Sequence, residues 1–324
     1  MSDSTLAPAS STIEPKRRKV RKRPPRDWSA YDKAQVDSAR LTLWLDKRLF
    51  AKPRPNGQRG RDELYSDELC LAALALKRLL HLPYRKLEGL VQSFAELSGY
   101  SGPTPDYSSL CRRAETLELP PLPRLSPGAQ LLLDSSGLRV FGPGEWRRHE
   151  HEAKRNWLKI HLAQDGAGQI VDFSLSETSG YGSGDSEAGR RLLAALAERG
   201  AEPETVYGDG AYDTGPVRKA AHALGARAVI PPKRTAKIYG GPRRRKPLEE
   251  WERERNQQVR ACRADRKRWK RDSGYHARSK AESGFSRWKS LLGPSLASRT
   301  PERQQVEAAV SVWLLNKLAA AAPT

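Results

Sequence analysis

Residues 130–140 decide the fold, and they read Gln-Leu-Leu-Leu-Asp-Ser-Ser-Gly-Leu-Arg-Val. A short apolar run of this kind is typical of a buried β-strand rather than of a helix, which needs a longer periodic segment. We therefore predict a strand over residues 130–140. Asp134 directly follows three leucines, so the apolar part of this strand ends on a carboxylate.

The segments that follow this strand predict an α/β order. Strands are predicted over residues 157–163, 170–175, 205–207 and 226–230, and helices over residues 187–199 and 216–224. Three adjacent strands followed by alternating helices and strands indicate a mixed sheet with flanking helices. This order resembles the ribonuclease-H-like fold, and we expect such a domain over residues 128–317.

Residues 231–273 interrupt that order with a segment rich in Arg, Lys and Gly, which we interpret as an insertion that is helical over part of 248–270. Trp251 and Trp269 lie among its charges. Basic residues interleaved with tryptophans suit neutralisation of a nucleic-acid backbone and stacking on bases, which makes Trp251 a candidate DNA contact. A helix whose tryptophans pack on the core explains the pattern equally well.

Residues 28–120, upstream of the sheet, have helical spacing. The predicted helices cover residues 69–80, a segment that begins at Pro83, and residues 107–117 after a capping Asp106. Two helices, a break containing glycine and a short basic-faced helix are compatible with an all-α, helix-turn-helix-like DNA-binding domain. Its last helix would present Arg112 and Arg113. A plain helical bundle that packs or dimerises is the alternative.

Residues 1–27 form a polar and then strongly basic tail, which we predict to be disordered. Lys16, Arg17 and Arg18 begin its cationic run. We interpret these three residues as candidate DNA contacts of a nonspecific arm. A solvated tail with no specific role, or a nuclear-import signal, would have the same composition.

The charge balance points to a polyanionic partner. The 324 residues carry 58 Lys and Arg against 38 Asp and Glu, a formal net charge of +20. Phosphate neutralisation with counterion release is the usual physical reason for such an excess. No signal peptide and no apolar run of the ~20 residues that a membrane span needs is found. Three scattered cysteines indicate neither a disulfide framework nor a thiolate zinc site, and no Gly-Lys-Ser/Thr phosphate loop supports a nucleotide cofactor.

Two aspartates follow apolar strands. Asp134 is one, and Asp209 is the other, with Gly208 and Gly210 on either side of it. One such aspartate would mean little, because aspartates are common at turns. Two of them on strands expected to be neighbours indicate a shared site.

A third carboxylate lies on a patterned helix. Tyr275, Arg278, Glu282 and Lys289 follow one another at intervals of three, four and seven residues. At about 100° per residue, all four project within roughly 60° of one another. Beside them an apolar stripe is predicted to pack on the sheet, made of Ala281, Phe285, Trp288 and Leu292. A simple ion pair between Arg278 and Glu282 would explain only those two residues.

These residues resemble the DDE transposases of bacterial insertion sequences. The run from Tyr275 to Lys289 matches the Tyr-x2-Arg-x3-Glu-x6-Lys signature of that group at every position. Within the group the chain is most similar to the insertion-sequence-five type, because the blocks that begin at Asp134, at Asp209 and at Ala228 resemble its motifs. The resemblance extends over residues 28–317. It departs at Gly184-Asp185, where a His-Asp pair is expected, and at Gly208, where alanine is usual.

The resemblance implies an enzyme that cuts and joins DNA by metal-dependent phosphoryl transfer. Asp134, Asp209 and Glu282 would be catalytic and would hold two Mg²⁺ ions, with Mn²⁺ as a substitute. Arg278 and Lys289 would contact phosphates, and Tyr275 would position or stack on the DNA. Aspartates 185 and 213 are interpreted as structural or supporting residues rather than metal ligands.

The resemblance also implies the partners and the place of action. The substrates would be double-stranded DNA, namely the terminal inverted repeats of the element and its target, and a homodimer would form in the synaptic complex. The protein would act in the bacterial cytoplasm at the nucleoid, without a membrane or nucleotide partner. A catalytically inert, transposase-derived DNA-binding regulator is the main alternative. A structural RNA-binding protein would account for the charge alone.

Overall fold

The computed structural model describes most of the chain. The described residues are 27–38, 47–50, 64–140, 157–177, 184–241 and 245–321. Lys16, Arg17 and Arg18 lie outside these residues, so the predictions for the basic tail stay predictions. Within the described ranges, no helix combines the length and the apolar character needed to cross a bilayer.

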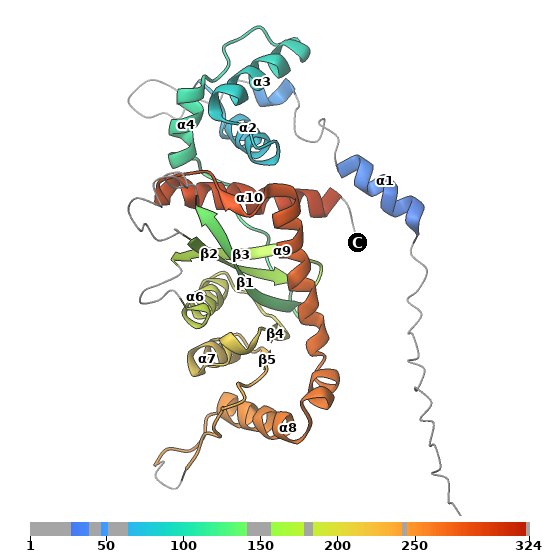
Figure 1. Cartoon of the computed structure of the whole chain (residues 1–324), viewed down its shortest axis with the longest axis vertical. Helices are drawn as coiled ribbons and strands as arrows, with labels where there is room; N and C mark the ends of the chain where they lie inside the picture. Colours follow the sequence, from blue (N-terminus) through green and yellow to red (C-terminus); the bar gives the residue numbers. More distant parts are fainter. Residues whose placement is uncertain are drawn as a thin grey trace, which may run out of the picture.

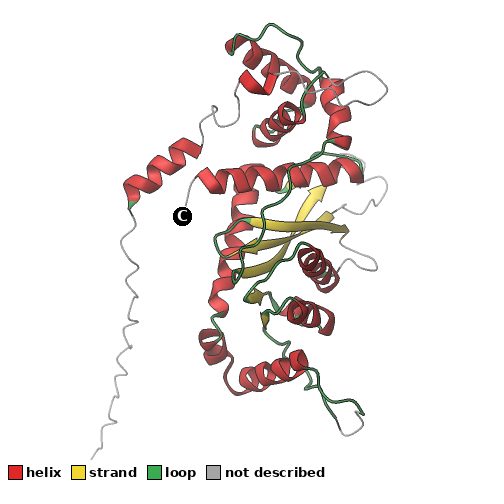
Figure 2. Ribbon diagram, turned by 180° about the vertical axis from the view of Figure 1, so that it is seen from behind, coloured by secondary structure: helices red, strands yellow, loops and turns green. Residues whose placement is uncertain are grey.

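The centre of the molecule is a mixed β-sheet (Figures 1 and 2). Its strands are β1 (Gln130–Val140), β2 (Trp157–Asp165), β3 (Ile170–Glu177), β4 (Thr205–Tyr207), β5 (Arg227–Val229) and β6 (Ser295–Leu296). The order is β3-β2-β1-β4-β5, and β6 also pairs with β1. The pairs β1–β2 and β2–β3 are antiparallel, whereas β4 and β6 run parallel to β1, and β5 parallel to β4. The predicted mixed α/β class is therefore confirmed.

Helices cover both faces of the sheet, and β1 contributes to both cores because strand side chains alternate. Leu131 and Leu133 pack in one core with α6 (Asp185–Glu198) and α7 (Gly215–Ala223). On the opposite face, Leu138 packs with α9 (Ser279–Leu292) and α10 (Pro301–Ala321). Leu132 lies in a smaller cluster with Tyr207, Trp269 and Ala281. The same alternation sends neighbouring residues of β1 to different helices, which matters for Asp134.

The N-terminal half contains α1 (Trp28–Ser38), the 3₁₀ helix η2 (Lys47–Phe50), α2 (Asp67–Leu79), α3 (Tyr84–Leu97) and α4 (Tyr107–Thr116). The Ser66 hydroxyl accepts a hydrogen bond from Leu69 N at 3.2 Å, and the Asp106 carboxylate accepts one from Ser109 N at 2.7 Å. Both bonds satisfy amide groups at a helix start that would otherwise lack a partner. The predicted starts of these two helices are thereby confirmed.

The last helix joins the N-terminal helices to the sheet, a feature that the sequence analysis does not predict. Figure 1 shows α10 between α2–α4 and the strands. Val310 of α10 packs in the core of α2, α3 and α4. The Arg78 guanidinium donates to the Ser311 hydroxyl at 3.1 Å, and it lies 3.4 Å from the Glu307 carboxylate. The division into separate N-terminal and catalytic domains stays a prediction, because this helix packs on both.

The basic insertion is dominated by α8 (Glu250–Asp272). A capping box between Glu249 and Glu252 begins the helix, and it kinks at Asp265, whose φ of −155° and ψ of 102° are not helical. Trp251 and Trp269 are both buried. The Trp251 indole N–H donates to the Glu249 carboxylate at 2.7 Å. Of the two alternatives for these tryptophans, the structure has the one in which they pack on their surroundings.

Candidate active site

The register of the sheet brings the two strand aspartates together. Leu131 lies opposite Val206 and Leu132 opposite Tyr207 in the parallel pair of β1 and β4. The same register, continued by two residues, places Asp134 level with Asp209 just past the end of β4. β1 continues past Asp134 to Val140 against β2, as predicted. β4 ends two residues before Asp209, so this carboxylate lies in the loop that follows the strand.

Arg278 joins the three carboxylates that the sequence singles out. Its guanidinium donates to Asp134 Oδ1 at 3.1 Å and to Glu282 Oε1 at 3.1 Å. The Asp209 carboxylate lies 4.0 Å from the same group. Three chain segments far apart in sequence therefore contribute one carboxylate each to a single cluster, which we call the carboxylate cluster: Asp134, Asp209, Glu282 and Arg278.

The carboxylate cluster opens toward solvent. The exposed fraction of the side chain rises from 11% for Asp134 to 42% for Asp209 and 65% for Glu282. Burial raises the pKa of the Asp134 carboxyl above its ordinary value, although the charge of Arg278 offsets part of that rise. Burial also acts to lower the pKa of Arg278, but the charge of Asp134 and its neighbours holds that pKa above its usual range. Asp134 and Arg278 therefore stabilise each other's charge, whereas the neighbouring Asp209 acts against the charge of Asp134.

The helix that carries Glu282 begins later than expected. Tyr275–Arg278 form a separate 3₁₀ helix, η4, and α9 starts at Ser279. The assumed α-helical angles therefore do not apply to Tyr275 and Arg278, since a 3₁₀ helix has three residues per turn. The apolar stripe of α9 is buried as predicted, namely Ala281, Phe285, Trp288 and Leu292. Gly284 allows α9 to lie close to β2, because a Cβ at that position would collide with the Gln164 side chain.

A second polar group supports Asp134 from the other face of the sheet. Ser135 follows Asp134 on β1, so it points to the α6 side, where its hydroxyl donates to Asp185 at 2.7 Å. Lys159 donates to the same carboxylate at 2.8 Å. These two hydrogen bonds hold the pKa of Asp185 below its ordinary value, against the burial that would raise it. Asp185 thus acts as a supporting residue behind the cluster, as interpreted from the sequence.

His161 completes this supporting group, and the sequence analysis does not single it out for this role. Its ring is fully buried, with Nε2 2.9 Å from the Ser176 hydroxyl and Nδ1 3.5 Å from Asp185. Burial lowers the pKa of His161 to about 4, although the charge of Asp185 acts in the opposite direction. The imidazole is therefore neutral at pH 7.

Asp213 belongs to a different, closed ion-pair network. Arg218 Nε donates to its carboxylate at 2.8 Å, and Arg255 Nε donates to it at 3.0 Å. The side chains of Asp213 and Arg218 are 0% and 1% exposed. Arg218 also donates to the Ile230 carbonyl at 2.7 Å. This network holds α7, α8 and the end of β5 together, so the structural interpretation of Asp213 fits the geometry.

The other candidate DNA contacts lie outside the carboxylate cluster. Lys289 and Arg112 are exposed. Arg113 forms an ion pair with Asp67 instead of projecting freely. Trp251 is 9% exposed, and its role as a DNA contact stays a prediction.

Tyr275 lies between the cluster and the insertion. Its ring centroid is 5.8 Å from that of Trp269, and Lys270 Nζ lies 5.3 Å from the Tyr275 ring centroid. Burial raises the pKa of the Tyr275 hydroxyl. Tyr275 is followed three residues later by Arg278, so one short segment connects the basic helix to the carboxylates.

The donor set of the cluster fits a hard divalent cation. Carboxylate oxygens are the ligands that Mg²⁺ takes in proteins. Among the described residues no group of three or more His, Cys, Asp and Glu is gathered closely enough to hold a metal ion. At this site the Arg278 guanidinium stands among Asp134, Asp209 and Glu282.

Family models and solved structures show what the chain is similar to. A family model described as a transposase DDE domain matches residues 126–317, and a second model with the same description matches residues 36–143. A structure of a Drosophila P element transposase strand transfer complex is similar at 11% identity and a TM-score of 0.28, over 60% of this chain and 43% of that chain. A piggyBac transposase synaptic complex with hairpin DNA is similar at 9% identity and a TM-score of 0.39, over 89% of this chain and 73% of that chain. The match over residues 126–317 covers more than half of the chain. The chain therefore belongs to the DDE transposases.

Proposed function

We propose that Asp134, Asp209 and Glu282 form the catalytic centre of this transposase and that it cleaves and rejoins DNA strands. The observation that carries the proposal is their convergence on Arg278, with contacts of 3.1, 4.0 and 3.1 Å. Like charges gathered at a solvent-open position are costly unless a cation compensates them. A cluster that serves packing alone has no need for this excess of carboxylates.

The three carboxylates would hold two Mg²⁺ ions, or Mn²⁺ in their place. The ions, when bound, supply activation of a water or DNA 3′-hydroxyl and stabilise the leaving oxygen of an in-line displacement. Side chains and backbone groups of the protein set the charge and the geometry of the site. Arg278 and the Ser135 amide, which donates at 3.0 Å, favour the ionised form of Asp134 against the burial that raises its pKa. The guanidinium of Arg278 has the planar geometry that suits a bidentate contact with a DNA phosphate.

The substrate we propose is double-stranded DNA, with the terminal inverted repeats of an insertion sequence as the specific site and a second DNA as target. The net charge of +20 supports a DNA partner, and the strand order β3-β2-β1-β4-β5 supports the ribonuclease-H-like assignment. The blocks that begin at Asp134, Asp209 and Ala228 support the insertion-sequence-five type. We propose further that two copies act together on two ends, and that α2–α4 read the repeat.

Strand cleavage tests this proposal. A labelled duplex that carries the terminal repeats flanking the protein's own gene is incubated with Mg²⁺ or with EDTA, for wild type and for Asp134→Asn, Asp209→Asn and Glu282→Gln. We expect nicking at the repeat end only with the metal, and a loss of at least about 10³-fold in each variant, because each removes a carboxylate charge that would hold the metal ions. Duplex affinity should persist.

Either of two results would contradict the proposal or redirect it. Normal cleavage by any one of the three variants would remove that residue from the catalytic centre. Tight binding of the repeat without cleavage, under Mg²⁺ and under Mn²⁺, would support the inert regulator instead. The isosteric substitutions keep the hydrogen-bonding shape of the side chains, so a loss of cleavage reports on charge rather than on folding.

A further inference from the structure

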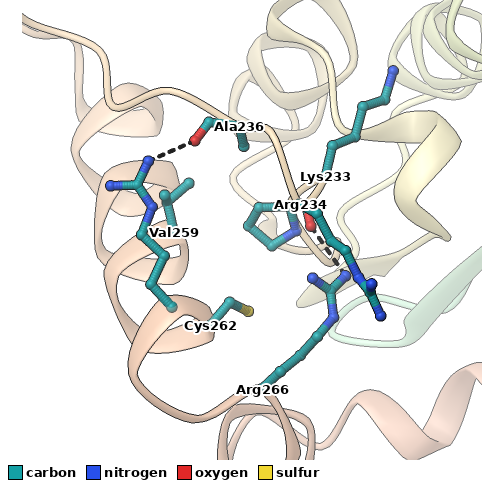
Figure 3. Close-up of a pocket in the computed structure, with 8 residues that line it drawn as sticks. Lys233, Arg234, Ala236, Val259, Cys262 and Arg266 are labelled. Carbon is teal, nitrogen blue, oxygen red and sulfur yellow. Dashed lines mark hydrogen bonds between the residues drawn. The ribbon is translucent and has the colours of Figure 1, made fainter.

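A strongly basic cleft lies between the loop after β5 and the helix α8, apart from the carboxylate cluster (Figure 3). Its volume is about 210 Å³. Lys233 and Arg234 line it from the loop, and Arg263 and Arg266 line it from the helix. Cys262 and Val259 form part of its floor. We call Lys233, Arg234, Arg263 and Arg266, together with the space between them, the basic cleft.

The basic cleft has an unbalanced charge. Its lining residues include four cations and no carboxylate. Within the described part of the chain, none of the four forms an ion pair with an acidic side chain. Like charges that share a cavity repel one another, and an anion between them removes that repulsion. The cleft therefore has the chemistry of a site for an anion.

Two of the cations also hold the loop in place, and this shapes the cleft. Arg263 donates to the Ala236 carbonyl at 2.9 Å, and Arg266 donates to the Pro232 carbonyl at 3.0 Å. Each guanidinium has five N–H donors and uses one group for these contacts. Figure 3 shows the Arg266 side chain extending from α8 toward the loop. The side chains of Lys233 and Arg234 are exposed and have no such structural task.

The basic cleft adjoins the carboxylate cluster through a short run of the chain. One turn of α8 separates Arg266 from Trp269 and Lys270, which contact the Tyr275 ring at 5.8 and 5.3 Å. The segment from Tyr275 then leads to Arg278. Positive charge thus continues from the cleft to the three carboxylates along α8 and η4, which is the arrangement that a bound polyanion strand requires.

We propose that the basic cleft binds a backbone phosphate of the DNA strand that enters the carboxylate cluster. The inference rests on the proposed function, because it supplies an anchoring site for the same substrate. A phosphate contact of this kind positions the duplex without reading its sequence. Lys233, Arg234, Arg263 and Arg266 are therefore DNA-positioning residues, and α8 contributes through these cations rather than through Trp251.

The salt dependence of DNA binding tests this site. We compare wild type with the double variant Lys233→Gln/Arg234→Gln, which removes two cleft charges and, among the described residues, no side-chain hydrogen bond. The matched control is Arg253→Gln/Arg260→Gln, because both arginines are exposed on α8 and lie outside the cleft. Affinity for a fluorescein-labelled duplex is measured by anisotropy in EDTA at several NaCl concentrations.

The expected result is a smaller slope of log affinity against log salt in the cleft variant. Each lost phosphate contact reduces the magnitude of that slope by about 0.9, so a decrease of about 1–2 is expected for the cleft variant and little change for the control. An unchanged slope in the cleft variant would overturn the proposal. An equal decrease in both variants would overturn it too, because the number of charges alone would then account for it.

Alkylation of Cys262 gives a direct measure of occupancy. Cys262 and Cys111 are partly exposed, whereas Cys70 is buried. The rate of modification by N-ethylmaleimide is followed at each cysteine by peptide mass spectrometry, with and without the duplex. We expect the duplex to slow the reaction at Cys262 several-fold in the wild type, and we expect this protection to be lost in the Lys233→Gln/Arg234→Gln variant.

The outcomes separate this inference from the proposed function. Protection by inorganic pyrophosphate but not by the duplex would mean that the cleft takes a small anion, which overturns the DNA assignment. Normal wild-type binding and cleavage, with an unchanged slope and no protection of Cys262, would overturn the cleft alone. A wild-type protein without affinity for the duplex would overturn both proposals.

Discussion

Two aspartates only four positions apart, Asp209 and Asp213, enter ion-pair clusters of opposite character. Asp213 is shared by Arg218 and Arg255, so two arginines surround one carboxylate, and its side chain is fully buried. Asp209 belongs to the carboxylate cluster, in which three carboxylates share Arg278. The exposed fraction of their side chains rises from Asp134 through Asp209 to Glu282.

The difference teaches how to separate a structural ion pair from a reactive one. A buried carboxylate with its full complement of donors fixes the packing of the elements around it, and losing one partner leaves a buried charge without compensation. An open group with more carboxylates than cations retains unmet negative charge at a surface that a ligand can reach. Perturbed charges of this kind are typical of functional sites.

The largest expected effect breaks the closed network. Asp213→Asn removes the only carboxylate between two buried arginines, and burial already lowers the pKa of Arg218 despite the attraction of Asp213. We expect the free energy of unfolding to fall by about 3–5 kcal/mol, measured by urea denaturation. The matched variant Asp209→Asn should change it by less than about 1 kcal/mol, because that carboxylate is partly solvated. Equal losses in the two variants would refute the distinction.

The next effect concerns acid stability behind the carboxylate cluster. Burial lowers the pKa of His161 to about 4, whereas an unfolded histidine titrates near pH 6.5. The unfolded state therefore binds the proton more readily, and the free energy of unfolding should fall by up to about 3 kcal/mol as the pH drops from about 6.5 toward 4. His161→Gln should flatten this part of the curve relative to wild type. A wild-type curve with the same slope as the variant would count against a buried neutral imidazole.

The smallest effect has the opposite sign. Burial raises the pKa of Asp134 in the folded protein, so the ionised carboxylate opposes folding and its cost appears as the pH rises through that pKa. Asp134→Asn stays neutral at every pH and should increase the free energy of unfolding at pH 7 by about 0.5–2 kcal/mol. The gain should shrink in acid, where the wild-type carboxyl is protonated. A destabilised variant at pH 7 would show that Asp134 serves the fold rather than the reaction.

The local sequence pattern was sufficient to predict the bounds of some elements. The bounds of β1 and β4 agree with the prediction at every residue, 130–140 and 205–207. The helix α10 was missed for a physical reason: it is packed between the sheet and the N-terminal helices, with Val310 and Leu314 buried on different sides. A helix that is buried most of the way round has no amphipathic stripe to reveal it.

Interactions between distant segments were not predictable from spacing. We assumed that Tyr275 and Arg278 lie on the same α-helix as Glu282. In the structure they lie in the 3₁₀ helix η4, where the Tyr275 ring packs against Trp269. Trp251 was weighed evenly between stacking on DNA and packing. Its burial depends on the position of α8 against α7, which no local signal contains.

The sequence by itself determined the strands, the helix caps, the apolar stripe of α9 and which carboxylates stand out, because these follow from local period and side-chain chemistry. Only the tertiary structure decided that Asp134 is level with Asp209 and that Arg278 lies among three carboxylates while Asp213 lies between two arginines. Strand register and helix packing set those distances. Both depend on contacts between residues far apart in the sequence, such as Asp134 and Arg278, and no local pattern encodes them.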